Sequence, residues 1–421
     1  MTRGRTSLRY ASPMAGPDRN RRRWLTPPVA GIGAASLLSD AGHEIPTALL
    51  PSFLVSTLGA PAAALGLIEG MADGLSGMAR LAGGALADDP HRRREIAIGG
   101  YATTAVISGL IGIATSVWQV GVLRVGAWVA RGLRVPSRNA LLADATPPET
   151  YGRAYGFERA MDNLGAIIGP LLALVLVALV GIRSAILISV IPGLLAAGAI
   201  MFAIKRLPRL QRRDRQRLKL RVRETLTGPL RRIMVGISAF ELGNLAATLM
   251  ILRATELLAP SHGTRGATEL AILLYVSYNL AATLASIPAG RMADRRGSIR
   301  VLRLGVALFG ASYAGFAVSG PNLLVLLIVF VVAGVAIGCV ETAEHSTVAS
   351  LSATEARGSA FGILAGVQSF GNLAASSIAG VLWTVVSAST AFWYAATWML
   401  IALISLALPP TGKETLDRSS Q

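Results

Sequence analysis

The chain has 421 residues, of which 52% are hydrophobic and only 15% charged, and its formal net charge is +17. A soluble domain has about 25% charged residues, so this composition excludes an ordinary soluble protein. The basic residues form separate clusters between apolar runs, which argues against a continuous nucleic-acid-binding face.

Apolar runs of roughly 20 residues, long enough to cross a bilayer as helices, recur from Val29 to Leu408. In chain order we expect membrane helices at about Val29–Leu58, Pro61–Ala87, Ile96–Thr115, Val117–Ala143, Tyr151–Val180, Ser184–Ile204, Ile233–Leu258, Ala267–Ala289, Val301–Val318, Asn322–Ser350, Gly358–Trp383 and Ala388–Leu408. The sequence therefore predicts an all-α membrane protein with twelve transmembrane helices.

These helices divide into two groups of six around a basic segment. We expect a basic disordered N-terminal tail, an N-terminal six-helix half, a basic cytoplasmic linker, a C-terminal six-helix half and a cytoplasmic tail at residues 1–27, 28–204, 205–232, 233–408 and 409–421. Basic residues gather in the N-terminal tail, in the linker and in two short loops, so the positive-inside rule places both termini in the cytoplasm. We expect a multi-pass protein of the inner membrane without a removable signal peptide.

One short charged segment occurs twice at a half-chain spacing. Gly290–Arg300 reads Gly-Arg-Met-Ala-Asp-Arg-Arg-Gly-Ser-Ile-Arg, and Gly84–Arg94 is a weaker copy 206 residues earlier. Asp88 and Asp294 keep this spacing. A charged loop repeated between apolar helices indicates a duplicated membrane domain.

The Gly290–Arg300 segment resembles the loop signature of the major facilitator superfamily. The earlier copy departs from that signature at Asp89, where the family prefers a base, and at His91, where it prefers glycine. The resemblance implies the major facilitator fold, with its two six-helix halves in a parallel pseudo-twofold repeat, and transport by alternating access. It assigns gating roles to the loop residues Gly84, Asp88, Arg92, Gly290, Asp294, Arg295 and Gly297. We expect the two aspartates to act as latches with nearby arginines.

The fifth predicted helix contains a glycine pattern. Gly156, Gly165, Gly169 and Pro170 resemble the antiporter signature of drug and proton exchangers in this superfamily, with Ala173 in place of the final glycine. The resemblance implies efflux rather than uptake. The other interpretation is a packing face with a kink, because glycine permits close helix contact and proline removes a backbone donor.

Ionisable residues within the predicted helices indicate a wet cavity. The third, sixth, ninth and twelfth helices carry charge only at their ends, so we expect every third helix to face lipid. The residues that we assign to the cavity or to proton coupling are Asp40, His43, Glu44, Glu69, Asp73, Arg131, Arg159, Asp162, Glu241, Glu341, Glu344 and His345. Asp40, Glu44 and Glu69 are the first candidates for a proton carrier, the alternative being structural ion pairs with arginines.

Other charged groups have more than one interpretation. Arg124, Arg131 and Arg138 form one stripe of the fourth helix, either as counter-charges for carboxylates or an anionic substrate, or as a network that holds a closed state. Glu341, Glu344 and His345 share a helix face and could bind a divalent metal, although such clusters more often form salt bridges. We predict no resident metal. Arg159 and Asp162 are expected to form an ion pair.

The sequence predicts a secondary transporter that exports a small molecule in exchange for protons. No phosphate-binding loop and no nucleophile–base motif is present, so we expect neither an enzyme nor a cofactor. The expected partners are a small-molecule substrate, protons and the lipid bilayer, with no nucleic acid, and the protein is expected to be a monomer. The alternatives are export of a metal ion, metal chelate or siderophore, and a membrane binding or sensory protein that does not transport.

Overall fold

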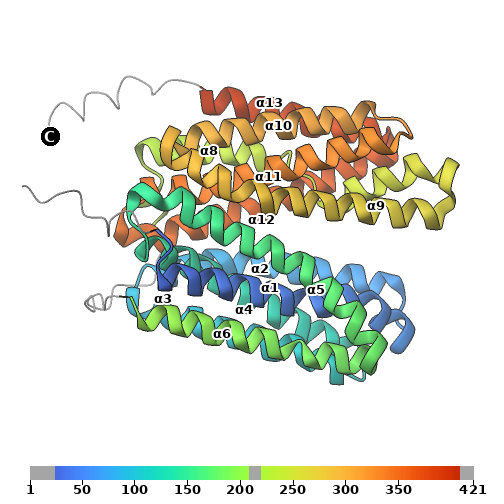
Figure 1. The fold of residues 1–421 in the computed structure, drawn as a ribbon, viewed down its shortest axis with the longest axis horizontal. Helices are drawn as coiled ribbons and strands as arrows, with labels where there is room; N and C mark the ends of the chain where they lie inside the picture. Colours follow the sequence, from blue (N-terminus) through green and yellow to red (C-terminus); the bar gives the residue numbers. More distant parts are fainter. Residues whose placement is uncertain (1–23, 208–219, 408–421) are drawn as a thin grey trace, which may run out of the picture.

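The computed structural model describes residues 24–207 and 220–407, which form two helical bundles lying side by side (Figure 1). The N-terminal bundle contains α1 (Pro27–Ser52), α2 (Ala62–Ala87), α3 (Pro90–Leu110), α4 (Val117–Asp144), α5 (Tyr151–Ile188) and α6 (Val190–Lys205). The C-terminal bundle contains α8 (Gly228–Glu241), α9 (Ala247–Arg296), α10 (Ser298–Val318), α11 (Leu323–Leu351), α12 (Arg357–Val385) and α13 (Ala388–Ala407). One helical turn, α7 (Val222–Thr225), precedes α8.

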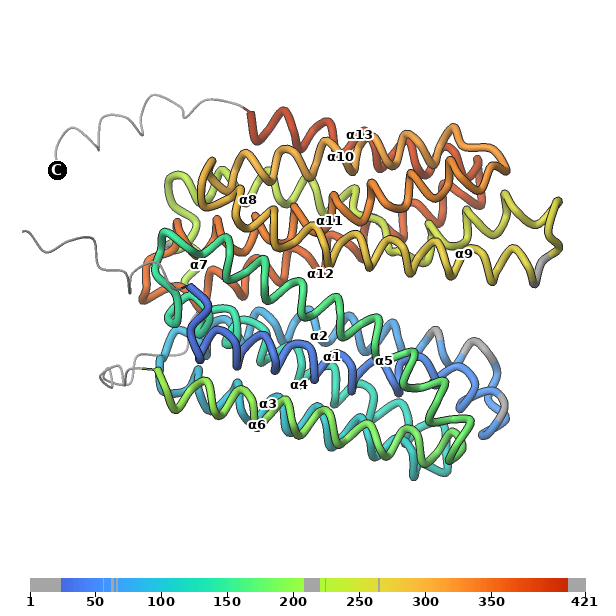
Figure 2. Tube along the Cα trace, viewed as in Figure 1, coloured from blue at the N-terminus to red at the C-terminus, as the bar shows by residue number. Residues whose placement is uncertain are grey.

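Two of the helices contain the turn between passes: α5 includes the fifth pass and the start of the sixth, and α9 includes the end of the seventh pass and the eighth. α5 is interrupted at Gly181 and α9 at Gly263, where φ is 77° and 69°, and Figure 2 shows the chain turning back within α9. Glycine takes this left-handed conformation without the steric penalty that other residues meet. With these reversals the described helices make the twelve passes that the sequence predicts, in two six-helix halves.

Six stretches of the described chain are long and apolar enough to cross a membrane by length and composition alone. One of them, Pro148–Lys205, has 58 residues and contains two passes. Helices such as α1, α2 and α4 fall outside this group and carry several ionisable residues. Charges inside spanning helices normally face protein or water, so we expect these residues to lie between helices or at a cavity.

The seventh pass differs from the expected helix at Ile233–Leu258. It begins earlier, at Gly228 within the predicted linker, and it is broken between Glu241 and Ala247. Side chains of neighbouring helices bond to the open backbone: Tyr313 Oη accepts from the Leu245 N–H at 3.1 Å, Ser376 Oγ accepts from the Ala246 N–H at 2.9 Å, and Asn372 Nδ2 donates to the Asn244 carbonyl at 3.0 Å. Non-helical backbone at membrane depth needs such partners.

The third pass also begins earlier than expected, at Pro90 instead of Ile96. Asp89, which departs from the family signature, caps this helix, because its Oδ1 accepts hydrogen bonds from the backbone N–H groups of His91 and Arg92 at 2.8 and 3.4 Å. Proline at the first helical position favours the same start. The departure at Asp89 is therefore explained by helix capping.

The predicted tails and linker are described only in part. Residues 1–23, 208–219 and 408–421 lie outside the described residues, so the expected tail disorder and most of the linker stay predictions. The first turn of α1 and the last turn of α13 lie at the same end of the molecule in Figure 2. An even number of passes requires this arrangement.

The two halves contact each other mainly through α2 with α12 and α5 with α9. Glycines permit both contacts. A Cβ built on Gly84 would lie 2.6 Å from the Gly362 Cα, and one built on Gly290 would lie 2.3 Å from the Gly152 carbonyl oxygen. Real side chains do not reach such distances, so only glycine fits. Gly84 and Gly290 are related by the half-chain repeat, and so are Gly358 and Gly152; the Gly358 carbonyl oxygen lies 2.9 Å from a Cβ built on Gly84. Both contacts close the same end of the molecule.

Candidate functional site: a charged central cavity

A cavity of about 530 Å³ lies between the two halves. Its lining comes from α2, α4 and α5 of the N-terminal half, from α8, α11 and α12 of the C-terminal half, and from Asn244 and Ala246 in the broken seventh pass. The expected lipid-facing helices α3, α6, α10 and α13 contribute none of the described lining residues. Leu195 of α6 and Ile404 of α13 are instead exposed on the outside of the bundle. The described lining agrees with the predicted outer helices, whereas α1 and α9, which we expected at the cavity, contribute none of it.

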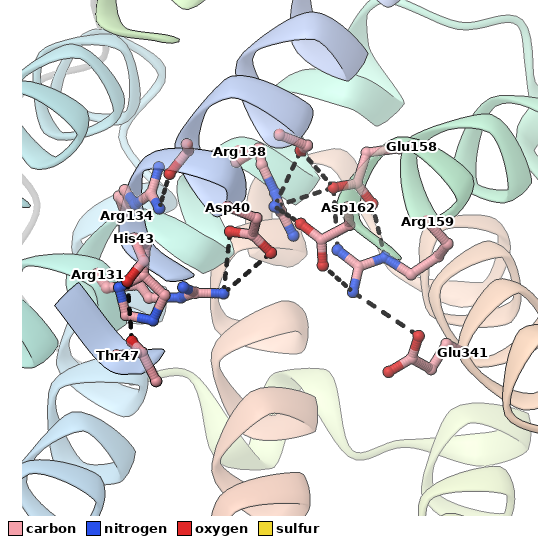
Figure 3. Close-up of polar contacts among 12 residues, drawn as sticks. Asp40, His43, Thr47, Arg131, Arg134, Arg138, Glu158, Arg159, Asp162 and Glu341 are labelled. Carbon is pink, nitrogen blue, oxygen red and sulfur yellow. Dashed lines mark hydrogen bonds and ion pairs between the residues drawn. The ribbon is translucent and has the colours of Figure 1, made fainter. Parts of the chain in front are cut away.

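Two of the three predicted proton carriers are held in ion pairs. Arg131 Nη2 lies 3.1 Å from Asp40 Oδ1 (Figure 3), and Arg124 Nη2 lies 2.9 Å from Glu69 Oε1. Both arginines belong to the stripe on α4. The stripe therefore supplies counter-charges to carboxylates on α1 and α2, which is one of the interpretations that the sequence left open.

The third arginine of the stripe belongs to a larger buried network (Figure 3). Arg138 Nη1 lies 2.9 Å from Glu158 Oε1 and 3.3 Å from Asp162 Oδ1. Arg159 Nε lies 2.8 Å from Glu158 Oε2, and Arg159 Nη1 lies 3.1 Å from Asp162 Oδ2, so the expected Arg159–Asp162 pair is present. Arg159 Nη1 also lies 4.0 Å from Glu341 Oε2 of the opposite half. These contacts fix the orientation of both arginines.

His43 and Asp73 are joined through one tryptophan. The His43 ring lies 4.1 Å from the Trp128 ring, measured between centroids, and Trp128 Nε1 donates to Asp73 Oδ1 at 2.7 Å. The Arg124 guanidinium stacks over the same indole at 3.6 Å from its centroid. Trp128 therefore contacts groups from α1, α2 and α4, of which Asp73 lines the cavity.

Glu44 and the glycine pattern of α5 meet where α1 and α5 cross. A Cβ on Gly169 would lie 2.4 Å from the Glu44 Cβ, and one on Gly165 would lie 2.6 Å from the Leu37 carbonyl oxygen. Gly156 faces the other half, where a Cβ would lie 2.3 Å from the Ser286 carbonyl oxygen. The pattern thus packs α5 closely against α1 and α9, which agrees with the packing interpretation, while its implied export role stays a prediction. Pro170 lies inside α5, directly after the Gly169 contact.

The C-terminal half contributes buried carboxylates that form no ion pair among the described residues. Glu344 has no exposed side-chain surface. Its Oε2 accepts from Gln368 Nε2 at 2.8 Å, and its buried Oε1 has no hydrogen-bond partner. Glu241 is 3% exposed and accepts from Asn244 Nδ2 at 3.0 Å. Among the described residues, neither Glu241 nor Glu344 forms an ion pair with a base, in contrast to Asp40 and Glu69.

The predicted cluster of Glu341, Glu344 and His345 does not form a metal site in the structure. Within the described part of the chain, no three His, Cys, Asp or Glu side chains are grouped so that they could hold a metal ion. The His345 Nδ1 lies 2.7 Å from the Glu341 backbone carbonyl, and its ring lies 5.7 Å from the Tyr155 ring. This ring nitrogen is therefore used in a backbone hydrogen bond.

Some cavity residues were not anticipated from the sequence. Arg80 of α2 lines the cavity, and Gln368 and Asn372 of α12 reach Glu344 and the broken seventh pass. Arg80 follows Asp73 by seven residues, so helical spacing places both on one face and could have revealed it. Nothing in the local sequence indicates the partners of Gln368 and Asn372, because these contacts join helices far apart in the chain.

The gating loops form latches between the halves at the closed end. Asp294 Oδ1 accepts from the Gly152 N–H at 2.7 Å, and Asp294 Oδ2 lies 2.6 Å from Arg153 Nε, so the expected aspartate–arginine pair is present, and its gating role stays a prediction. In the repeat-related position, Asp88 Oδ1 accepts from the Ser359 N–H at 2.8 Å, and the expected arginine partner of Asp88 stays a prediction.

The other gating residues lie around these latches. Gly297 ends α9 with φ of 91°, in the left-handed region that favours glycine. Arg92 Nε lies 3.8 Å from Asp89 Oδ2, and Arg295 is exposed on the surface. Neither arginine belongs to the latches as described. Their predicted gating roles are not tested by this arrangement.

Comparison with known proteins identifies the family. The sequence matches the family model of the Major Facilitator Superfamily over residues 32–257 and 233–420, which together span both halves. The chain belongs to this superfamily. Its members with this fold are membrane transporters, so the protein is a multi-pass membrane transporter with a substrate.

Individual relatives agree with this assignment. The chain is 28% identical over 376 residues to an uncharacterised MFS-type transporter of Methanocaldococcus jannaschii, covering 88% of this chain and 92% of that one. It is 39% identical over 79 residues, or 19% of each chain, to the multidrug resistance protein MdtG of Proteus mirabilis. The solved structure of a bacterial homologue of the iron transporter ferroportin in an outward-facing state has a TM-score of 0.73 and 16% identity, covering 94% of this chain and all of that one.

Proposed function

We propose that this superfamily member is a proton-coupled exporter of a small molecule, and that Glu241 and Glu344 take part in carrying the proton. The observation that carries the proposal is the burial of these two carboxylates beside the cavity without an ion pair to any base among the described residues. Burying an ionised carboxylate without a partner costs several kcal/mol, so each needs a proton or a cationic group nearby.

The need to neutralise these carboxylates favours exchange of substrate for protons. When the cavity changes the side to which it opens, its walls close around whatever is bound, and an unneutralised carboxylate pair then becomes more costly. A proton or a cationic substrate group can neutralise the pair, and the two compete for the same oxygens. Alternation of the two occupants moves protons in one direction and substrate in the other.

Other observations support the direction and the orientation. The α5 glycine pattern resembles that of antiporters, and a short segment resembles the multidrug resistance protein named above. The basic loops and the latches lie at one end, which we assign to the cytoplasm of an inner-membrane protein by the positive-inside rule. We further propose that the protein acts as a monomer.

A proton-flux assay tests the coupling. Everted membrane vesicles containing the protein are acidified by respiration and then challenged with a library of small organic cations, anions and zwitterions. We expect some compounds to dissipate the pH gradient in wild-type vesicles, and we expect Glu344→Gln and Glu241→Gln to abolish that response. Glu256→Gln is the matched control, because Glu256 is exposed in the same half and outside the cavity lining.

A wild-type protein that moves a compound without proton movement contradicts the proposal. Full proton coupling in both glutamine variants also contradicts it, and Glu44 would then be the next candidate for the proton carrier. Binding without any flux under an imposed gradient would favour a binding or sensory protein.

A further inference from the structure

The cavity has opposite charges on its two walls. The N-terminal half lines it with Arg80, Arg131, Arg134, Arg138 and Arg159, together with Asp73 and Asp162. The C-terminal half lines it with Glu241, Glu341 and Glu344 and, among the described lining residues, no arginine or lysine. A molecule in this cavity therefore lies between a wall rich in guanidinium groups and a wall rich in carboxylates.

Most of the arginines already have partners, but Arg80 does not. Arg131, Arg138 and Arg159 form the ion pairs described above, and Arg134 Nη2 donates to Ser39 Oγ at 2.7 Å. Among the described residues, Arg80 has no hydrogen-bond or ion-pair partner, and its Nε is buried. The Arg80 side chain is partly exposed and lines the cavity, and its guanidinium has no acceptor among the described residues, which makes it an available anion-binding group of the cavity.

The available group on the opposite wall is a carboxylate. Glu344 uses one oxygen to accept from Gln368, while Oε1 is buried without a partner. Glu241 lies close enough to Glu344 for the two to interact electrostatically. A cationic group of a ligand would neutralise these carboxylates, and an anionic group of the same ligand would pair with Arg80.

The surfaces between these charges are partly apolar. Phe240, Phe370 and Leu373 line the cavity from the C-terminal half, and the side chains of Phe370 and Leu373 are 43% and 51% exposed. Exposed aromatic and aliphatic surface inside a cavity favours an apolar ligand body. The volume of about 530 Å³ lies within the range of small-molecule sites.

We propose that the substrate is a zwitterion with an apolar body, whose anionic group binds Arg80 and whose cationic group binds Glu344 and Glu241. The inference rests on the proposed function in taking this cavity as the transport site. It adds a physical reason for exchange: the cationic group of the substrate displaces the proton, and the anionic group compensates Arg80. A singly charged ligand would leave either Arg80 or Glu344 without a partner.

Matched probes test this directly. The purified full-length protein is titrated with 4-(aminomethyl)benzoate as the zwitterion, 4-methylbenzoate as the anion and 4-methylbenzylamine as the cation, and with the corresponding naphthalene and biphenyl sets. Binding is measured from the ligand-dependent rise in melting temperature. We expect the zwitterion of at least one set to bind at least tenfold more tightly than both of its singly charged analogues.

Variants test which residue binds the anionic group and which binds the cationic group of the zwitterion. We expect Arg80→Gln to weaken the zwitterion at least tenfold and to leave the affinity for the cation unchanged, and Arg80→Lys to restore part of the loss. Glu344→Gln should weaken the zwitterion and leave the affinity for the anion unchanged. The matched controls are Arg206→Gln and Glu256→Gln, because both residues are exposed outside the cavity lining.

The inference is overturned if a singly charged analogue binds as tightly as the zwitterion in every set, if no member of any set binds, or if Arg80→Gln leaves zwitterion binding unchanged. Its failure is distinguishable from failure of the proposed function. Proton-coupled flux of singly charged compounds, unaffected by Arg80→Gln, would support the function and refute the zwitterion. Zwitterion binding without proton flux would support the zwitterion and refute the proposed function.

Discussion

At the scale of single residues, the buried charges of the N-terminal half hold one another in place. Glu158 has no exposed side-chain surface and lies within 3 Å of both Arg138 and Arg159. Its Oε1 also accepts from Ser36 Oγ at 2.7 Å, which joins α1 to the network. Each arginine is therefore fixed by a group that does not itself line the cavity. Glu158 acts as a positioning residue for Arg138 and Arg159.

Glu158→Gln is expected to destabilise the protein. Breaking a buried ion pair by removing one partner costs about 3–5 kcal/mol, because the other charge is left without compensation. Asp162 reduces this loss, so we expect the melting temperature in detergent to fall by at least about 5 °C. The control is Glu95→Gln, whose side chain is 67% exposed and pairs only with His91. A fall in melting temperature no larger than that of the control would show that Glu158 does not hold the network.

The sequence predicted which residues are charged inside the membrane, but not all of their partners. Spacing along α4 placed Arg124, Arg131 and Arg138 on one stripe, because helical periodicity is a local property. The distinction between the paired Asp40 and the unpaired Glu344 depends on which helices face each other. That is a long-range property, and no local pattern in one sequence reports it.

At the scale of elements, glycines set how closely the helices of opposite halves approach. A Cβ on Gly290 would lie 2.3 Å from the Gly152 carbonyl oxygen, and a Cβ on Gly84 would lie 2.9 Å from that of the repeat-related Gly358. The repeated loops allowed this symmetry to be predicted from the sequence. The break after Glu241 was not predicted, because the apolar run continues through it and the side chains that stabilise it come from α10 and α12.

Gly290→Ala is expected to weaken the closed arrangement of this end. The added methyl group would lie 2.3 Å from the Gly152 carbonyl oxygen, so α5 and α9 must separate. We expect a shift of about tenfold toward conformations with this end open, equivalent to about 1.4 kcal/mol. Electron–electron distances between spin labels at Lys205→Cys and Arg300→Cys, in a Cys339→Ser background, would measure the shift.

Gly198→Ala is the matched control for this experiment. A Cβ on Gly198 of α6 meets no atom within 4 Å, so the helix can accept it without moving. Identical distance distributions for Gly290→Ala and Gly198→Ala would refute the idea that glycine contact controls closure.

At the scale of the whole molecule, two repeat-related latches join the halves, and they are not equal. Asp88 accepts hydrogen bonds from Ser359 at the start of α12, and Asp294 accepts from Gly152 and Arg153 at the start of α5. Both carboxylates thus lie at helix N-termini, where negative charge is favourable. Arg153 stands in the repeat position of Ser359 and adds an ion pair to the Asp294 latch.

This inequality predicts different effects of neutralising the two aspartates. Asp294→Asn loses the ion pair with Arg153 as well as the favourable charge at the helix terminus. Asp88→Asn keeps an oxygen that can accept from Ser359. We expect Asp294→Asn to populate the open arrangement at least about threefold more than Asp88→Asn, as measured with the same spin-label pair, since a partly exposed ion pair contributes up to about 1 kcal/mol. Arg153→Gln should reproduce most of the Asp294→Asn effect and leave the Asp88 latch intact. Equal opening in the two aspartate variants would mean that the ion pair adds nothing, and that the helix termini alone hold the two halves together at this end.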